Sequence, residues 1–249
     1  VKIPFIDNNK VYVLAIGRDI TEQRRTQNKI EAQNKELEAS YQQLEEHTEK
    51  ILDLNLFPII LGGGHEIAFG HYNGLKQFVS KDEGSNLPGI INFDAHFDMR
   101  PYDQGPNSGT MFRQIADMSE QEQKNFSYFV LGIQKYSNTL SLFKKAEELG
   151  VEYLLARDIK EYNLNKITRK LDRFIEKHEQ IYLTVCSDVF SSAFAPGVSS
   201  PQPFGLDPEI ALQLIKYVIK SRKTLSVDIA EVSPRFDEDN HTAKLASVI

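Results

Sequence analysis

The stretch Gly89-Ile-Ile-Asn-Phe-Asp-Ala-His-Phe-Asp98 joins a short apolar run to a group of acidic and imidazole side chains. A run of this kind, without alternating polar residues, is typical of a strand that is buried on both faces of a parallel sheet. Further apolar runs of similar length alternate with amphipathic stretches from about residue 52 to the C-terminus. This alternation predicts an α/β fold with three layers, in which helices cover both faces of one parallel sheet.

The positions of these runs give the expected elements. We expect strands at residues 57–61, 89–93, 128–131, 151–155, 181–186 and 224–229. We expect helices at residues 66–79, 140–149, 166–177 and 208–220. Open parallel sheets bind their ligands at the carboxyl ends of the strands, so polar residues at those ends are the candidates for a functional site.

Composition restricts the class of protein. The chain has 249 residues, of which 41% are hydrophobic and 26% charged, and this balance excludes wholesale disorder. A formal net charge of −6 argues against nucleic acid as the main partner. The single cysteine, Cys186, cannot form an internal disulfide, which fits a reducing compartment. With neither a bilayer-length apolar run nor a signal-peptide layout, we expect a soluble cytoplasmic protein without a membrane partner.

The first 50 residues differ from the rest. Residues 2–6 and 11–16 predict two strands around a turn, and residues 18–57 contain neither Gly nor Pro. Within this second stretch four apolar residues recur every seven positions: Ile30, Leu37, Leu44 and Ile51. The other seam positions are polar or aromatic: Gln27, Asn34, Tyr41 and Thr48. The pattern predicts a long polar helix that either self-associates as a coiled coil or lies on the rest of the protein.

Asp94, His96 and Asp98 follow a predicted strand at alternate positions. Alternate residues of an extended chain point to the same side, so these three side chains can converge on one point. Two carboxylates and an imidazole suit a divalent transition metal such as Mn²⁺ or Zn²⁺. The alternative is a polar strand end with solvated acids and a surface histidine.

The segment Leu61-Gly-Gly-Gly-His-Glu66 ends another predicted strand and supplies a second imidazole, that of His65. Three glycines permit a tight turn before the next helix. Such a turn could instead bind phosphate at the helix N-terminus. No Lys-Ser/Thr pair follows, however, and Glu66 would repel an anion.

Two more strand ends bear candidate residues. Cys186 and Asp188 lie two positions apart, on one face, although Cys186 could equally be a small buried apolar residue. A loop at residues 191–205 follows, rich in Pro and small residues, and loops of this length are usually functional or disordered. The last strand runs into Asp228-Ile-Ala-Glu231, which places Glu231 just beyond the sheet unless it is a surface acid.

The order of these motifs resembles the ureohydrolase (arginase–agmatinase) family: GGGHE at 62–66, DAHFD at 94–98, CSD at 186–188 and DIAEVSP at 228–234. The variants GGGHE, NSGTMFRQ (107–114) and FSSAFAPGVSSPQPFG (190–205) are most similar to its formimidoylglutamase branch. The resemblance covers about residues 50–249. It implies a three-layer αβα sheet of the arginase type.

The resemblance also implies a binuclear manganese centre, with two Mn²⁺ ions per subunit. The implied ligands are His65, Asp94, His96, Asp98, Cys186 and Asp188. One ion would be held by His65, Asp94 and Asp98, the other by Asp94, His96 and Asp188, with Asp94 bridging. Most of the family has an aspartate where this chain has Cys186.

The activity implied is hydrolysis of the linear amidine C–N bond of N-formimidoyl-L-glutamate to L-glutamate and formamide, a step of histidine degradation. Glu231 would contact the cationic amidine, Asp98 would assist the attacking hydroxide and protonate the leaving amine, and Arg113 would pair with a substrate carboxylate. Phe112 stands where the arginase branch has a histidine proton shuttle. The alternatives are a related amidinohydrolase, acting on agmatine or a guanidino acid, and a non-catalytic signalling or scaffold protein that uses the N-terminal helix.

Residues 1–48, with GRDITE at 17–22, resemble the C-terminal edge of a PAS sensor domain and its signalling helix. We therefore expect two domains: residues 1–50, and a catalytic domain at residues 51–249. Family members have a further strand and helices before the GGGHE strand, so we expect the catalytic sheet to be N-terminally incomplete and its activity impaired. We also expect a homo-oligomer with a small-molecule amidine as substrate.

Overall fold

The computed structural model describes residues 2–7, 10–15, 21–82, 84–103 and 105–249, with side chains from residue 26 on except at 27. Two compact units emerge, Val1–Glu38 and Ala39–Ile249. The first holds an antiparallel hairpin of β1 (Lys2–Asp7) and β2 (Lys10–Ala15), as predicted, and the start of α1 (Thr21–Asp53). Turn residues 8–9 and most of GRDITE lie outside the described residues. The predicted domain boundary after residue 50 falls inside α1.

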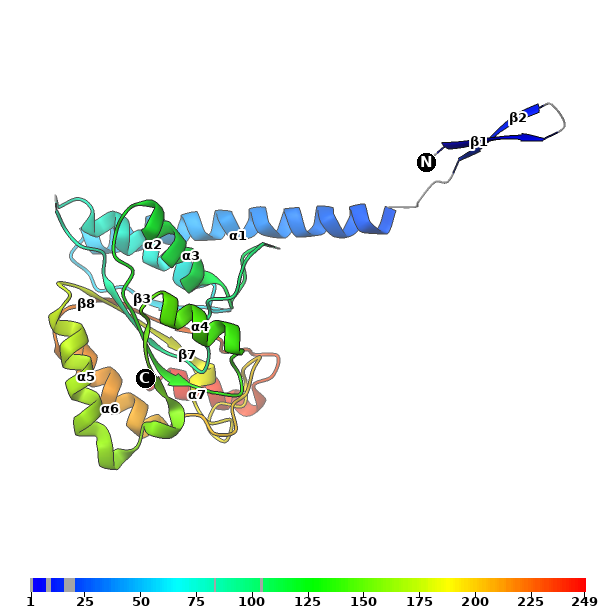
Figure 1. The fold of residues 1–249 in the computed structure, drawn as a ribbon. Coiled ribbons are helices and arrows are strands. Elements are labelled where there is room, and N and C mark those ends of the chain that lie inside the picture. Colours follow the sequence, from blue (N-terminus) through cyan, green and yellow to red (C-terminus); the bar gives the residue numbers. More distant parts are fainter. Residues whose placement is uncertain (1, 8–9, 16–20, 83, 104) are drawn as a thin grey trace. The chain divides into compact units, whose positions relative to one another are not determined.

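A parallel sheet forms the centre of the second unit (Figure 1). Its strands lie in the order β3 (Ile59–Leu61), β8 (Thr224–Ala230), β7 (Ile181–Cys186), β4 (Gly89–Phe93), β5 (Tyr128–Ile133) and β6 (Glu152–Leu155). Each predicted strand is present, and the predicted α/β class is confirmed.

Helices cover both faces of this sheet (Figure 1). One face packs against α2 (Ile67–Val79), α3 (Met111–Gln121) and α4 (Leu140–Glu148), the other against α5 (Leu164–Glu176) and α6 (Pro208–Lys220). The four predicted helices are confirmed, whereas α3 and the short α7 (His241–Ala246) were not predicted.

Alternation along the central strands explains the two cores. In β4, Ile91 and Phe93 join the cluster with α5 and α6, while Ile90 joins the cluster with α2 and α3. In β7, Leu183 joins the cluster with α5 and α6, and Tyr182 joins the cluster with α2 and α3. Since both faces are apolar, polar side chains on these strands are confined to the strand ends and to a few buried positions.

The last turns of α1 pack on α2 through two glycines. A Cβ at Gly70 would lie 2.8 Å from the backbone oxygen of Tyr41, and one at Gly74 would lie 2.7 Å from that of Glu45. Tyr41 and Thr48 are buried at this contact, whereas the apolar seam residues are only half-buried. Residues 39–53 thus behave as a helix lying on the rest of the protein, and self-association as a coiled coil stays a prediction. No described helix, α1 included, combines the length and apolarity needed to cross a membrane.

Gly74→Ala is expected to destabilise the protein by about 1–3 kcal/mol, the usual cost of overpacking. Alanine normally favours a helix over glycine by about 1 kcal/mol. Here, however, the new methyl group would stand 2.6 Å from Thr48 Cβ and 2.7 Å from a backbone oxygen of α1. Urea unfolding measures the change, and Gly63→Ala, which meets nothing within 4 Å, is the control. A higher midpoint for Gly74→Ala would contradict this packing.

β3 lies at one edge of the described sheet and pairs with β8. Ile59 and Leu61 on this strand are 66% and 77% exposed. An exposed apolar edge of this kind favours association with another strand. The predicted N-terminal incompleteness of the sheet, and its effect on activity, stay predictions.

Candidate metal centre

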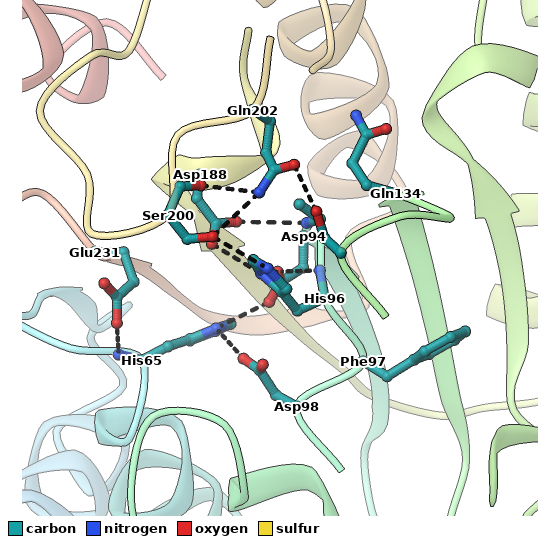
Figure 2. Close-up of polar contacts among 12 residues, drawn as sticks. His65, Asp94, His96, Phe97, Asp98, Gln134, Asp188, Ser200, Gln202 and Glu231 are labelled. Atoms are coloured by element: carbon teal, nitrogen blue, oxygen red, sulfur yellow. Dashed lines mark hydrogen bonds and ion pairs between the residues drawn. The ribbon is translucent and has the colours of Figure 1, made fainter. Parts of the chain in front are cut away.

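Neighbouring strand ends bring the predicted site residues together. His65 follows β3 and Asp94 to Asp98 follow β4. Cys186 is the last residue of β7, Asp188 lies in the helical turn directly after it, and Glu231 follows β8. Because β3, β8, β7 and β4 are adjacent and parallel, their carboxyl ends meet at one edge of the sheet. Figure 2 shows His65, Asp94, His96, Asp98 and Asp188 pointing toward one centre, with Glu231 beside His65.

The first group of possible ligands surrounds His65. Its Nδ1 lies 3.0 Å from Asp94 Oδ2 and 3.2 Å from Asp98 Oδ2. Ligand atoms of His65, Asp94 and Cys186 all lie within 4.8 Å of one another. The structure therefore places the Cys186 thiol beside the residues predicted to hold the first ion.

A second group shares Asp94. His96 Nδ1 lies 2.9 Å from Asp188 Oδ2 and 3.6 Å from Asp94 Oδ1, and ligand atoms of these three residues also lie within 4.8 Å of one another. This group coincides with the ligands predicted for the second ion, with Asp94 between the two groups. Carboxylates, imidazoles and a thiol together suit cations of intermediate hardness, so the residues fit a pair of divalent transition metals.

Burying these charged side chains without a bound cation is unfavourable in free energy. Asp94, Asp188 and His65 are at most 4% exposed, and buried charges are normally paired or bound to metal. Asp94 is also held by neighbours: its Oδ2 accepts a hydrogen bond from the Asn92 side-chain amide at 3.0 Å, and its Oδ1 accepts one from the His96 backbone N–H at 2.7 Å. Asn92 was not identified from the sequence, because it resembles any other residue inside the apolar run.

The imidazoles and carboxylates alter each other's pKa values. Burial alone would lower the pKa of His96, but hydrogen bonds with Asp188 and Asp94 raise it to about 11. The pKa of His65 is also raised: burial alone would lower it, but hydrogen bonds with Asp94 and Asp98 have the larger effect. Burial, followed by the negative charge of Asp94, raises the pKa of Asp98 to about 7. A cation entering this cluster must therefore displace protons from the imidazoles.

Cys186 is buried at the end of β7. Burial, and then the charges of Asp188 and Asp94, raise the pKa of its thiol well above the ordinary value. The protein's own groups therefore keep the thiol protonated at neutral pH, and the thiolate forms only with a cation beside it.

We predict that Cys186→Asp preserves or tightens Mn²⁺ binding and removes sensitivity to thiol reagents. A carboxylate oxygen is a harder ligand than sulfur and suits Mn²⁺ better. Calorimetric Mn²⁺ titration and activity after treatment with a thiol reagent are the two measurements, with Cys186→Ala as the variant that supplies no ligand. If Cys186→Asp unfolds and thiol reagents leave the wild type fully active, the cysteine is a core residue instead.

Glu231 stands above the first group of ligands on left-handed backbone, with φ of 64°. Its Oε1 accepts a hydrogen bond from the His65 backbone N–H at 3.0 Å, and its Oε2 accepts one from the Ser199 hydroxyl at 2.9 Å. Asp98 also has a positive φ, of 50°. Such backbone is sparsely populated by residues other than glycine and often occurs at functional sites.

A cavity of about 230 Å³ opens over these side chains. Its lining residues are His65, His96, Asp98, Arg100, Ser108, Gly109, Cys186, Asp188, Ser199, Ser200 and Glu231. Arg100 and the two serines of the 191–205 loop were not identified from the sequence. Arg100 stands two positions after Asp98, so its place beyond a strand end was the available signal. Ser200 Oγ lies 3.4 Å from His96 Nε2, which brings the loop onto the site (Figure 2).

Arg113 does not reach this cavity. Its Nε lies 2.9 Å from Asp117 Oδ1, one turn further along α3, and it lines a separate cavity of about 540 Å³ with Tyr102 and Lys145. Phe112 is fully buried and stacks on Tyr128 with ring centroids 4.4 Å apart. The helix therefore turns Arg113 away from the site and places an inert ring where the arginase branch has its shuttle.

Comparison with known proteins agrees with this geometry. The sequence matches the arginase family over residues 12–249. A formimidoylglutamase of Clostridium tetani is 54% identical over 222 residues, which are 88% of this chain and 65% of that protein. A formimidoylglutamase of Streptococcus pyogenes is 44% identical over 248 residues, 99% of this chain and 71% of that protein. The chain thus spans about two thirds of the length of these relatives.

Solved structures give the same fold. The crystal structure of formimidoylglutamase from Bacillus subtilis matches 83% of this chain and 63% of its own with a TM-score of 0.72 at 27% identity. An arginase from Bacillus subtilis matches 84% of this chain and 76% of its own with a TM-score of 0.72 at 21% identity, which shows the fold alone.

These matches correct the interpretation of the N-terminus. The family match begins at residue 12, so the predicted start of the resemblance at about residue 50 was too late. The resemblance of residues 1–48 to a PAS domain finds no support. With nearly the whole sequence inside one family match and the expected ligands together at one sheet edge, the chain belongs to the arginase family.

Proposed function

We propose that this chain hydrolyses N-formimidoyl-L-glutamate to L-glutamate and formamide at a centre of two Mn²⁺ ions. The observation that supports this most is the pair of buried ligand groups sharing Asp94, together with a cavity over them that is also lined by the Glu231 carboxylate and the Arg100 guanidinium. The relatives from Clostridium tetani and Streptococcus pyogenes are formimidoylglutamases. A degenerate scaffold without a metal centre would have no need of these buried acids.

The substrate presents a cation and two carboxylates, and the rim is complementary to it. Divalent cations, when bound, supply Lewis acidity and a nucleophile from water at neutral pH. Glu231 is positioned to accept hydrogen bonds from the amidinium nitrogens and to stabilise their positive charge. Hydrogen bonds from the His65 backbone and Ser199 fix both of its oxygens.

Asp98 is suited to proton transfer. A carboxylate in the wall of the cavity can accept a proton from a nearby water molecule and pass it to a nearby amine. Water addition to the amidine carbon releases a proton, and departure of the glutamate amine consumes one. Asp98 lines the cavity where both events would occur, so we assign it as the proton carrier.

Arg100 replaces Arg113 as the proposed partner of a substrate carboxylate. It is exposed at the mouth of the cavity, and its guanidinium lies against Gly109, where a Cβ would stand 3.1 Å from Arg100 Cζ. Arginine binds carboxylates through paired N–H donors, which gives both strength and orientation. A substrate with a carboxylate is therefore favoured over agmatine, which has none.

A panel of amidine substrates tests the proposal. The Mn²⁺-loaded chain is assayed with formimidoylglutamate, agmatine and a guanidino acid, and the products are identified by mass spectrometry. We expect formamide and glutamate from the first substrate, and a raised KM in Arg100→Met but not in Arg113→Met. Preference for agmatine, or equal effects of the two variants, would contradict the assignment.

A further inference from the structure

A second polar network lies behind the metal centre, between α2 and strands β7 and β8. Its side chains are His71, Tyr182, Thr184, Ser226 and Asp228, and each of them is 0% exposed. None of these residues belongs to the two ligand groups. The network touches the centre at one point, where Thr184 Oγ1 lies 2.9 Å from His65 Nε2.

His71 is hydrogen-bonded at both ring nitrogens. Its Nε2 lies 2.6 Å from the Ser226 hydroxyl, which in turn lies 2.9 Å from the carbonyl oxygen of Pro58. The other ring nitrogen, Nδ1, lies 2.5 Å from Asp228 Oδ2 and donates to this carboxylate. The His71 ring is therefore held from both sides and in turn holds Asp228 in place.

The same reasoning continues to His65. Asp228 Oδ1 accepts the Thr184 hydroxyl proton at 2.6 Å, so Thr184 Oγ1 is left as an acceptor for His65 Nε2–H. Tyr182 donates a further hydrogen bond to Asp228 Oδ2. The proton of His65 is thereby fixed on Nε2, and Nδ1 is the nitrogen that faces Asp94 and Asp98.

We propose that the His71–Asp228 pair is a positioning element of the metal centre, which acts through Thr184 to orient the His65 ring with Nδ1 toward the cation. Partners behind a histidine ligand normally set its tautomer and ring orientation. The buried pair also adds little net stability, since apolar residues of similar size are often as good or better. The proposal rests on the proposed cation centre but is independent of the substrate.

Mn²⁺ titration of the chelator-treated full chain by calorimetry tests the proposal. Thr184→Val keeps the shape of the side chain and removes the hydroxyl, and we expect it to weaken Mn²⁺ binding by about 10–100-fold. Thr184→Ser should restore most of the affinity, and His71→Leu should weaken binding in the same direction as Thr184→Val. Ser119→Ala, which removes another fully buried hydroxyl that bonds only within α3 at 2.8 Å, should leave the affinity unchanged.

The possible outcomes distinguish a failure of the proposed cation centre from a failure of the proposed positioning role. If the wild type binds no Mn²⁺, the proposed cation centre is wrong. If the wild type binds Mn²⁺ and folded Thr184→Val binds it equally well, only the positioning role is wrong. Should the variants fail to fold, ¹⁵N spectra of histidine-labelled wild type loaded with Zn²⁺ decide: a proton on Nε2 of His65 and on Nδ1 of His71 supports the proposal, and a proton-free His65 Nε2 overturns it.

Discussion

His96→Ala is expected to remove the second cation and to slow turnover about a thousandfold. The imidazole is the only neutral ligand of the group formed with Asp94 and Asp188, and two carboxylates alone leave that position incomplete. Losing one cation removes several kcal/mol of charge stabilisation, and 1.36 kcal/mol corresponds to tenfold in rate. Metal analysis of the purified variant and its kcat measure the two effects together.

The control for this variant is His47→Ala, which removes an exposed histidine of α1 far from the ligands in sequence. It should keep both cations and full turnover.

Binding of Mn²⁺ should also weaken as the pH falls, because protons compete with the cations for the histidine and carboxylate ligands. An unchanged metal content in His96→Ala, or full activity of chelator-treated protein, would refute the assignment.

Glu231→Gln should lower kcat/KM by about 10²–10³-fold while leaving the metal content unchanged. Glutamine keeps the size of the side chain and an oxygen that can accept from the His65 backbone, but it removes the charge proposed to contact the amidinium. The loss of one preorganised electrostatic contact in an enclosed site has this magnitude. Steady-state kinetics and metal analysis are measured side by side.

Glu238→Gln provides the matched control, since this glutamate is exposed and does not line the cavity. It should behave as the wild type in both measurements. Loss of a cation in Glu231→Gln would mean that the carboxylate is a ligand after all, and unchanged kcat/KM would mean that it does not contact the substrate.

The sheet and the clustering of the candidate ligands could be predicted from the sequence because both depend on local patterns. Asp94, His96 and Asp98 follow an apolar run at alternate positions, and parallel strands bring such ends to one edge. Arg113 was misplaced because a residue's direction on a helix depends on how that helix packs, and α3 itself was not predicted. The pair of His71 and Asp228 joins residues 157 positions apart, a contact that no local pattern reveals.

For the N-terminal segment, a local pattern was present but was not specific enough to identify a fold. A short hairpin followed by a polar helix is a pattern common to many folds, so it could not identify a PAS domain. The packing of α1 on α2 depends on Gly70 and Gly74, whose role appears only once the two helices are in contact. The homo-oligomer and the cytoplasmic location stay predictions.

Asp98 and Glu231 have left-handed backbone conformations that are unfavourable for residues other than glycine, although both carry side chains proposed to act in the reaction. Glycine at either position would adopt that conformation without steric cost, but Glu231→Gly would also leave the His65 backbone N–H and the Ser199 hydroxyl without their acceptor. Gln123 and Arg222 have the same left-handed backbone and do not line the cavity. Stabilisation of this chain by glycine should therefore begin at those two positions, which leaves the residues of the proposed reaction unchanged.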